Sequence, residues 1–507
     1  MLLWLKRRKW ELDNFWRFVK RSDGSLAQKV ARGSFWVFAL RIAGGGLGVV
    51  RTVLLARFLL PHDFGLVGMT LLALSTLETF TQTGLTWALI QKKRKIEPYL
   101  DSVWSVQVMR GMVLFLVLFL TAPWIARFFN EPRIVLLMRV VSISQLFKGG
   151  VNIGVVYFSK ELEFHKRFIY RLSGLLTDYG VSLLVALIWR NFWALAFGFL
   201  AGNLVSLVMS YKIHPYRPRF QLDWEKIRNL FGFGKYILGQ SVVLFLLTQG
   251  SRIFVGRVLG AAALGLYQMA YMISNLPVTE ITYAISEVTF PAYSRLQDET
   301  ERLKRALIKT LKITSFITIP LSVGILTLAP EFTKVFLGDK WLPMVLTLQV
   351  LCLFGLMRSL GAILGPVYHA LAKVNVILKI NILELLILVV ALFFLFFSWG
   401  ILGVAIAVTL SGAVSFYLAS KKMATILRID LLHLLKPVLF FMSASMGMAA
   451  LILLSRAYLF ESINYFSVVF LVIIGGLSYL GLSYTILRFF GGNLGFLVRA
   501  FSQFFVG

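Results

Sequence analysis

The sequence predicts an all-α integral membrane protein of about fourteen transmembrane helices, organised as two six-helix lobes and two C-terminal helices. Three observations lead to this fold class. Hydrophobic residues make up 58% of the 507-residue chain and charged residues 15%, against about 25% charged in soluble domains. Apolar stretches of about 20 residues, long enough to cross a bilayer, recur along the whole chain. The first and second halves also share a repeated motif.

The predicted spans follow one another with very short connections in several places. Arg190–Asn191 and Trp399–Gly400 are two such connections, and they predict antiparallel helical hairpins. The spans are predicted at 35–56, 64–90, 103–126, 134–158, 168–189, 191–211, 233–256, 264–290, 307–330, 341–370, 374–398, 401–420, 437–456 and 465–487.

Basic residues are concentrated in every second loop. If the N-terminus is cytoplasmic, the cytoplasmic loops hold clusters such as 92–95, whereas the outer loops hold few basic residues. Lysine and arginine accumulate on the cytoplasmic side of membrane proteins, so both termini are predicted to be cytoplasmic. The basic residues of the outer loops are Arg57, Arg127, Arg133, Arg190, Arg257, Lys340 and Arg456.

This pattern divides the chain into six predicted segments. The aromatic residues of the first segment allow it to rest on the membrane surface, and a frayed cytosolic terminus is the open alternative. The segments are a basic cytosolic tail at 1–34, an N-lobe at 35–211, a cytosolic linker at 212–232, a C-lobe at 233–420, the last two helices at 437–487 and a cytosolic tail at 488–507.

The sequence contains no motif of enzymatic chemistry. The five histidines are scattered and Cys352 is the single cysteine, so neither a metal-ligand set nor an intrachain disulfide is expected. A Gly-rich phosphate loop and a nucleophile elbow are both missing. We therefore expect no catalytic residue, no metal and no cofactor. The net charge of +29 does not indicate nucleic acid, because the basic residues form short clusters between apolar runs.

A motif near the first predicted outer turn recurs 200 residues later. ARFLLPHDFGLVGM at Ala56–Met69 aligns without a gap with GRVLGAAALGLYQM at Gly256–Met269, and both carry the arginine, leucine, glycine and methionine at equivalent positions. Six spans separate the copies, so both have the same orientation in the membrane, as in transporters built from two parallel bundles. Arg57 and Arg257 are expected either to anchor helix ends at the headgroups or to act in gating.

The same stretches carry a family resemblance. GRVLGAAALGLYQMAYMISNLP and EVTFPAYSRLQ, together with LLARFLLPHDFGLVGM, TGLTWALIQKK, APWIARFFNEP and YFSKELEFHKR, resemble bacterial polysaccharide flippases of the WzxC-like branch. These belong to the multidrug/oligosaccharidyl-lipid/polysaccharide exporter superfamily. The resemblance covers about residues 30–430. It implies two six-helix lobes around a central cavity.

The resemblance also implies a function. Such a protein moves undecaprenyl-pyrophosphate-linked oligosaccharide repeat units from the cytoplasmic to the outer leaflet of the bacterial inner membrane, for exopolysaccharide, capsule or O-antigen synthesis. Its partners would be the lipid-linked oligosaccharide and membrane lipids, with a polysaccharide polymerase and chain-length or export proteins as further candidates. A drug/cation antiporter of the same superfamily is the alternative, although it would favour an acidic cavity. A membrane glycan polymerase is disfavoured by the short outer loops.

Four arginines inside the predicted spans are candidate ligands for the pyrophosphate. An arginine at a helix centre costs roughly 2.5–3.5 kcal/mol, so it tends to face a polar cavity or a charged partner. Its planar guanidinium can hold a phosphate through two hydrogen bonds. Pairing with acidic residues inside the membrane is the alternative. The four are Arg41, Arg51, Arg252 and Arg358.

Four acidic residues inside the spans are candidates for coupling transport to a proton or sodium gradient. Glu280 and Glu287 share one side of the span at 264–290. The alternative is that the acids neutralise the arginines within the membrane. The candidates are Glu78, Asp178, Glu280 and Glu287.

Overall fold

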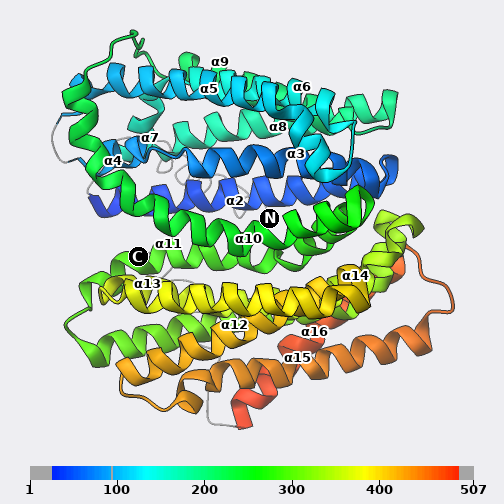
Figure 1. Ribbon diagram of the computed structural model, residues 1–507. Coiled ribbons are helices and arrows are strands. Elements are labelled where there is room, and N and C mark those ends of the chain that lie inside the picture. The colour runs from blue at the N-terminus through cyan, green and yellow to red at the C-terminus, as the bar shows by residue number, and fades with distance from the viewer. Residues whose placement is uncertain (1–25, 93–94, 490–507) are drawn as a thin grey trace, which may run out of the picture.

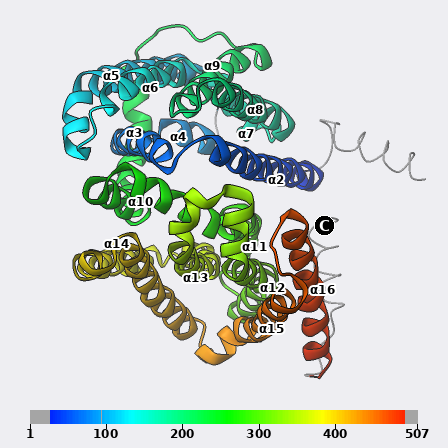
Figure 2. The ribbon, with the colours of Figure 1, turned by 90° about the vertical axis from the view of Figure 1, so that its right-hand side faces the viewer.

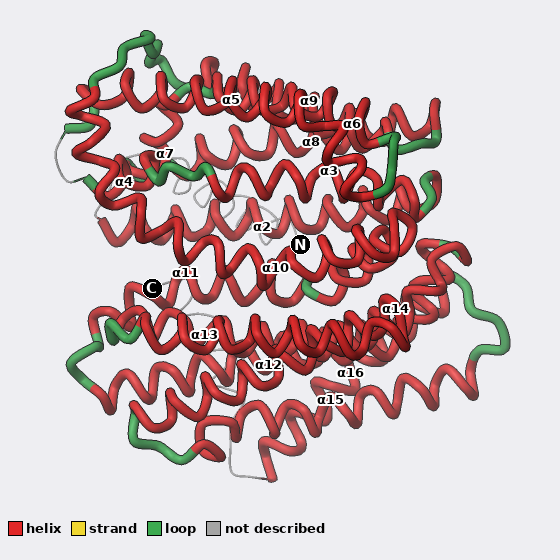
Figure 3. The backbone as a smooth tube through the Cα atoms, in the orientation of Figure 1, coloured by secondary structure: helices red, strands yellow, loops and turns green. Residues whose placement is uncertain are grey.

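The computed structural model describes residues 26–92 and 95–489, and all regular structure in these ranges is helical (Figure 3). Most of the predicted tails at 1–34 and 488–507 lies outside the described residues. The first half contains α2 (Leu26–Phe58), α3 (Pro61–Phe80), α4 (Leu85–Gln91), α5 (Glu97–Phe129), α6 (Ile134–Gly150), the 3₁₀ turn η1 (Ile153–Val155), α7 (Val156–Lys160), α8 (Phe164–Trp189) and α9 (Trp193–Ile213). The second half contains α10 (Trp224–Ser274), the π-helix η2 (Pro277–Thr282), α11 (Tyr283–Arg295), α12 (Thr300–Phe332), the π-helix η3 (Thr333–Leu337), the 3₁₀ helix η4 (Asp339–Met344), α13 (Val345–Ala370), α14 (Val374–Ile426), α15 (Leu431–Leu459) and α16 (Tyr465–Phe489).

The helices form two bundles. Helices α2–α9 are called the N-terminal bundle and α10–α14 the C-terminal bundle; α5, α6, α8 and α9 pack mainly within the first, whereas α3 packs mainly on α10 of the second. Helices α15 and α16 pack together beside α12. In Figure 1 the N-terminal bundle, in blue to teal, lies above the C-terminal bundle, in green to yellow, and α10 runs between them along α3.

Two helices fold back on themselves at a glycine. The backbone of α10 is non-helical at Gly260, where φ is 83°, and that of α14 is non-helical at Gly400, where φ is 53°. The hydroxyl of Tyr267 donates a hydrogen bond to Ser251 at 3.2 Å, although these residues would lie about 24 Å apart along a straight helix. Both helices are therefore hairpins of two antiparallel segments; the positive φ is combined with a ψ of -177° at Gly260 and -128° at Gly400, a backbone conformation that favours a residue without a side chain.

The number of spans differs with the way they are counted. Among the described residues, eleven helices are long and apolar enough to cross a membrane, and up to twelve if α6 and the segment Ile153–Lys160, bent by 70°, form one span. This count takes α14 as one helix, whereas the sequence divides it at Trp399–Gly400. The fold is a multi-pass membrane fold, and the number of fourteen spans stays a prediction.

Both copies of the repeated motif lie at one end of the molecule, which we call the repeat end. The opposite end, which holds the linker between α9 and α10, is called the basic end. At the repeat end, Gly65 of α3 lies against the backbone of Ala261, and Gly265 lies against the backbone of Pro61. Because 61 matches 261 and 65 matches 265 in the repeat, the two contacts are equivalent, and each copy of the motif packs on the other.

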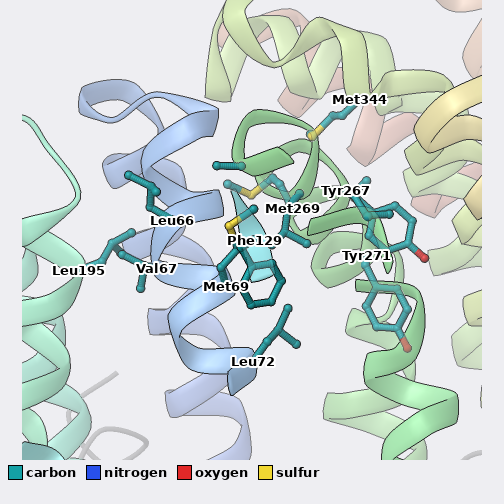
Figure 4. Close-up of a cluster of buried hydrophobic side chains, with 14 of the residues drawn as sticks. Leu66, Val67, Met69, Leu72, Phe129, Leu195, Tyr267, Met269, Tyr271 and Met344 are labelled. Atoms are coloured by element: carbon teal, nitrogen blue, oxygen red, sulfur yellow. The ribbon is translucent and has the colours of Figure 1, made fainter. Parts of the chain in front are cut away.

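The core of the molecule surrounds this contact. Leu66, Met69 and Leu264 are fully or almost fully buried, and the cluster that contains them draws residues from both bundles. Figure 4 shows Met69 and Met269 within this cluster, between the ribbons of α3 and α10. Side chains at the repeated leucine and methionine positions therefore pack beside the backbone contact of Gly65 and Gly265.

The linker between the bundles is held against α5. The carboxylate of Asp101 accepts hydrogen bonds at 2.8 Å from the hydroxyl of Tyr216 and from the backbone N–H of Arg219. The ring of His214 stacks on Tyr157 with centroids 5.3 Å apart. Burial lowers the pKa of His214, which favours its neutral form in this stack. The linker therefore has a fixed course over the basic end of the N-terminal bundle.

A methyl group at the glycine contact should weaken the fold. Gly65→Ala or Gly265→Ala places a Cβ against a backbone carbonyl, and such overpacking costs about 1–3 kcal/mol. Each variant should lower the thermal unfolding midpoint of the purified protein in detergent. Gly180→Ala in α8 is the matched control, because no atom lies within 4 Å of its added Cβ. Midpoints equal to that of the control would contradict the close contact.

Candidate functional site

At the repeat end, the C-terminal bundle holds the last turn of α2. The indole N–H of Trp341 donates to the carbonyl of Ala56, and the ammonium of Lys340 donates to the carbonyl of Arg57, each at 3.0 Å. The guanidinium of Arg57 donates to the carbonyl of Val335 and, at 2.8 Å, to the hydroxyl of Tyr465. The end of α2 is thus capped by side chains from η4, and Arg57 reaches into the second half of the chain.

Arg257 makes the equivalent contact in the opposite direction. With the amide of Asn130 oriented to satisfy both of its atoms, the oxygen of Asn130 accepts a hydrogen bond from Arg257 Nη1 at 2.9 Å. The guanidinium carbon of Arg257 also lies 5.6 Å from the ring centroid of Phe128. Each repeated arginine therefore holds the outer turn of the other bundle, η3–η4 in one case and α5–α6 in the other. We call these contacts the reciprocal arginine contacts.

A basic cavity lies inside the N-terminal bundle. It has a volume of about 510 Å³ and is bounded by α2, α8 and α9. Arg41, Arg167 and Arg171 line it, and Asp178 is the acidic residue in its wall. Aromatic rings lie near its mouth, where Trp36 and Phe168 have centroids 4.9 Å apart. The cavity begins near the start of α8, so it lies in the basic half of the molecule.

Arg41 lies where this cavity meets the C-terminal bundle. Its Nη1 donates to the carbonyl of Thr279 in η2 at 3.1 Å. The carboxylate of the next residue, Glu280, lies in the space left by Gly45, where a Cβ would touch it. The absence of a side chain at Gly45 of α2 therefore accommodates a side chain of the other bundle.

Arg51 forms an ion pair within the N-terminal bundle. Its Nη2 lies 2.7 Å from Oδ1 of Asp178 and also donates to the hydroxyl of Ser182 at 2.8 Å. The guanidinium carbon lies 5.0 Å from the ring centroid of Tyr179. This is the pairing that the sequence analysis set against a cavity role, and a direct role of Arg51 in binding stays a prediction.

The other acidic candidates have different surroundings. Oε1 of Glu78 lies 2.7 Å from Nζ of Lys148 and accepts a hydrogen bond from Gln145 at 2.9 Å. Glu280 lies at the contact between the bundles, as described above. The side chain of Glu287 lies outside the part of the chain whose side chains the structure describes.

Arg252 and Arg358 lie together in the C-terminal bundle. The guanidinium carbon of Arg252 is 4.3 Å from the ring centroid of Tyr271, whose hydroxyl accepts a hydrogen bond from Arg358 at 2.9 Å. Arg358 also donates to Asn275 at 3.1 Å and to Tyr283 at 3.0 Å. Among the described residues, none of the ion pairs involves either arginine. Both charges are therefore held mainly by neutral polar and aromatic groups.

Sequence reasoning did not select two of the cavity arginines. Arg167 and Arg171 are not among the four arginines selected from the sequence, and both lie on α8 and line the cavity. Their spacing of four residues, on the same helical face as Leu175, was the signal that could have identified them. The sequence also does not indicate the ion pair at 2.6 Å between the buried Glu331 and the partly exposed Arg456 at the repeat end.

The described residues contain no group of histidine, cysteine, aspartate or glutamate side chains that could hold a metal ion. The polar groups of the cavity and of the arginine pair are suited instead to an anionic ligand, because arginine donates two parallel hydrogen bonds to a phosphate. What this arrangement can do chemically is bind and release, without bond formation.

Removing one member of the Arg51–Asp178 pair should destabilise the N-terminal bundle. Arg51→Met or Asp178→Leu leaves a partly buried charge without its partner, at a cost of roughly 1–3 kcal/mol. The double variant removes both charges and should recover most of the loss. Thermal unfolding of the four proteins in detergent measures this cycle, and additive losses in the double variant would show that the pair contributes nothing.

Curated relatives match most of the chain. It is 28% identical over 376 residues to the lipopolysaccharide biosynthesis protein WzxC of Escherichia coli (strain K12), which covers 73% of this chain and 75% of the relative. It is 25% identical over 374 residues to the teichuronic acid biosynthesis protein TuaB of Bacillus subtilis (strain 168), covering 72% and 77%. It is 24% identical over 315 residues to the succinoglycan biosynthesis transport protein ExoT of Rhizobium meliloti (strain 1021), covering 62% and 64%.

Solved structures show the same fold. The inward closed conformation of the lipid II flippase MurJ superposes with a TM-score of 0.74 over 90% of this chain and 98% of that chain, at 18% identity. An inward-facing multidrug resistance transporter of the MATE family has a TM-score of 0.58 over 77% of this chain and 99% of that chain, at 15% identity. The predicted all-α membrane fold class is thereby confirmed.

The family itself follows from the sequence. The relatives carry the names of transport and biosynthesis proteins, and the resemblance to polysaccharide flippases agrees with them. The sequence model described as polysaccharide biosynthesis protein matches residues 54–346, which is more than half of the chain. This chain belongs to the polysaccharide biosynthesis protein family of membrane proteins.

Proposed function

We propose that this protein is a flippase that moves undecaprenyl-pyrophosphate-linked oligosaccharide repeat units from the cytoplasmic to the outer leaflet of the bacterial inner membrane. Three of its relatives are named for the biosynthesis of lipopolysaccharide, teichuronic acid and succinoglycan. A structure with the same fold is that of a lipid II flippase. No bond is made in such a step, so the protein is not an enzyme in this proposal.

The basic cavity is the main structural support for this proposal. Three arginines and one aspartate line about 510 Å³ at the basic half of the molecule, which suits the diphosphate that joins the sugar to the lipid. The aromatic and polar groups of the same walls, such as Trp36 and Asn203, can contact sugar rings and hydroxyls. The polyprenyl chain would remain in the bilayer while the headgroup enters.

The predicted pyrophosphate ligands then act in two groups. Arg41 binds in the N-terminal bundle with Arg167 and Arg171. Arg252 and Arg358 form the second group, where tyrosines contact both guanidinium groups and Glu384 lies near Arg358 without a direct ion pair. Arg51 supports the first group through its pair with Asp178.

The reciprocal arginine contacts form the outer gate in this proposal. They join the bundles at the repeat end, together with the glycine contact of α3 and α10. Release of the headgroup on the outer side requires that these contacts separate, as in alternating access by rocking bundles. The N-lobe at 35–211 and the C-lobe at 233–420 would be the two moving units, with the linker at 212–232 between them.

In this proposal the basic loops determine the orientation of the protein in the membrane, and the negative charge of the substrate provides part of the driving force for transport. In this proposal the basic end and both termini are cytoplasmic, because lysine and arginine accumulate in cytoplasmic loops. Each negative charge that moves outward across a membrane with an inside-negative potential gains roughly 2.3 kcal/mol per 100 mV. Coupling to a proton or sodium gradient would involve Glu280, because it lies at the contact between the bundles, with Glu78, Asp178 and Glu287 as the other predicted acids.

The alternative is a drug/cation antiporter, and the resemblance to a MATE transporter favours it at the level of fold. The excess of arginine in the cavity argues against a cationic cargo. Polysaccharide polymerase and chain-length or export proteins are the proposed partners, because they consume the flipped repeat unit.

Loss of a cavity arginine should reduce transport. Arg167→Ala, Arg171→Ala and Arg41→Ala each remove a charged hydrogen-bond donor worth about 1.5–3 kcal/mol, so export should fall roughly ten- to hundredfold. The measurement is surface polysaccharide in a strain that depends on the variant, with the lipid-linked repeat unit quantified in membranes. Arg228→Ala, an exposed residue outside the cavity, is the control. Wild-type export by all three cavity variants would refute the binding site.

Joining the bundles at the repeat end should stop transport. Arg57→Cys with Lys340→Cys, in a background without the buried Cys352, can be bridged by a reducible bifunctional reagent. Export should cease on bridging and return on reduction. His62→Cys with Glu131→Cys is the control, because these residues lie 3.2 Å apart at the same end but within one bundle. Equal inhibition by both bridges, or none by the first, would exclude opening at this end.

A further inference from the structure

A groove on the outside of the N-terminal bundle has no part in the function proposed above. It encloses about 900 Å³ between α5, α6 and α9. Figures 1 and 2 both place these helices on the side of the bundle that faces away from α13 and α14. The groove shares no lining residue with the cavity, although α9 borders both, and it lies away from the contact between the bundles.

The walls of the groove are apolar and face the membrane. Val108 and Met112 of α5, Leu146 of α6 and Val208 of α9 line it. The last three are large exposed hydrophobic residues, as expected for side chains that contact hydrocarbon. An acyl chain is the chemical group that such walls accept.

One end of the groove is basic. Lys212 lies in the last turn of α9, and Arg217 follows in the linker. Arg217 Nη1 donates to the carbonyls of His214 and Tyr216 at 2.8 and 2.9 Å, which fixes the guanidinium at the groove. No acidic residue is among the side chains that line the groove. The end thus presents two positive charges.

The dimensions match one leaflet. Trp104 and Tyr211 border the basic end, and such aromatic residues prefer the depth of the headgroups. The Tyr211 hydroxyl donates to the carbonyl of Gly150 at 3.0 Å, which joins α9 to α6 there. From Trp104 to Met112, α5 rises by about 12 Å. The hydrocarbon of one leaflet is about 15 Å thick, half of the bilayer core.

We propose that this groove binds one anionic glycerophospholipid of the leaflet at the basic end. Its phosphate would lie against Lys212 and Arg217, and one acyl chain would lie along Val108 and Met112. Basic pockets between transmembrane helices on the cytoplasmic side bind anionic headgroups in this way. Two unopposed positive charges favour an anionic over a zwitterionic lipid. The polyprenyl substrate is not the occupant, because the groove faces away from the bundle contact where Arg41 meets Thr279.

Native mass spectrometry of the delipidated full-length protein tests this site. Dioleoylphosphatidylglycerol should bind at one site at least tenfold more tightly than dioleoylphosphatidylethanolamine. Lys212→Gln combined with Arg217→Gln should weaken phosphatidylglycerol binding roughly 30-fold, since each basic residue near the surface contributes about a factor of five. Val208→Trp fills the groove without a change of charge and should also lower the affinity.

The control is Lys421→Gln, which removes a lysine beside Tyr417, 5.8 Å from its ring centroid, at the basic end of α14. It should bind phosphatidylglycerol as the wild type does. Equal binding of the two lipids by the wild type, or unchanged binding by the double variant and by Val208→Trp, would overturn the proposal. Displacement of the bound lipid by equimolar undecaprenyl phosphate would do the same, by assigning the groove to the polyprenyl chain. These measurements do not involve transport, so their failure leaves the flippase proposal intact.

Discussion

The approach of two helix backbones at Gly65 and Gly265 sets the arrangement of the whole molecule. Because neither glycine has a side chain, α3 and the second segment of α10 touch through carbonyl oxygens, and the outer turns of both bundles come within reach of the repeated arginines. The core around Met69 and Met269 then closes over the contact. A repeat that places a glycine and an arginine eight residues apart is therefore sufficient to build a two-bundle contact from equivalent parts.

Charged side chains inside the membrane contact different kinds of partner in the two bundles. In the N-terminal bundle, Asp178 and Glu78 each have a basic partner within 2.7 Å. In the C-terminal bundle, Arg252 and Arg358 contact the hydroxyls and rings of tyrosines, and the buried Glu384 lies near Arg358 without forming a direct ion pair. The interior thus keeps a net positive character on both sides of the contact, and this suits a cargo with negative charge better than a cationic drug.

The sequence was sufficient for the helical membrane class, for the hairpin at Trp399–Gly400 and for the family, because these depend on hydrophobic length, short connections and local motifs. It also set Arg51 against an acidic partner, and the structure supplies that partner in Asp178. Arg167 and Arg171 could not be recognised, because a basic residue near a span end has the same local pattern whether it faces a cytoplasmic loop or a cavity. The sequence also could not identify Val335 as the partner of Arg57 or Asn130 as the partner of Arg257. These partners lie about 280 and 130 residues away along the chain, and only the tertiary fold brings them together.

The hydrogen bonds that cap the end of α2 make opening of the repeat end depend on access of water. The last carbonyls of this helix are satisfied by Trp341 and Lys340 of the other bundle, not by residues of its own. Separation of the bundles leaves these carbonyls without partners, and each unsatisfied group costs about 1–3 kcal/mol unless water reaches it. Opening is therefore coupled to wetting of the helix terminus. High osmotic pressure, which lowers the activity of water, favours the closed state of the repeat end.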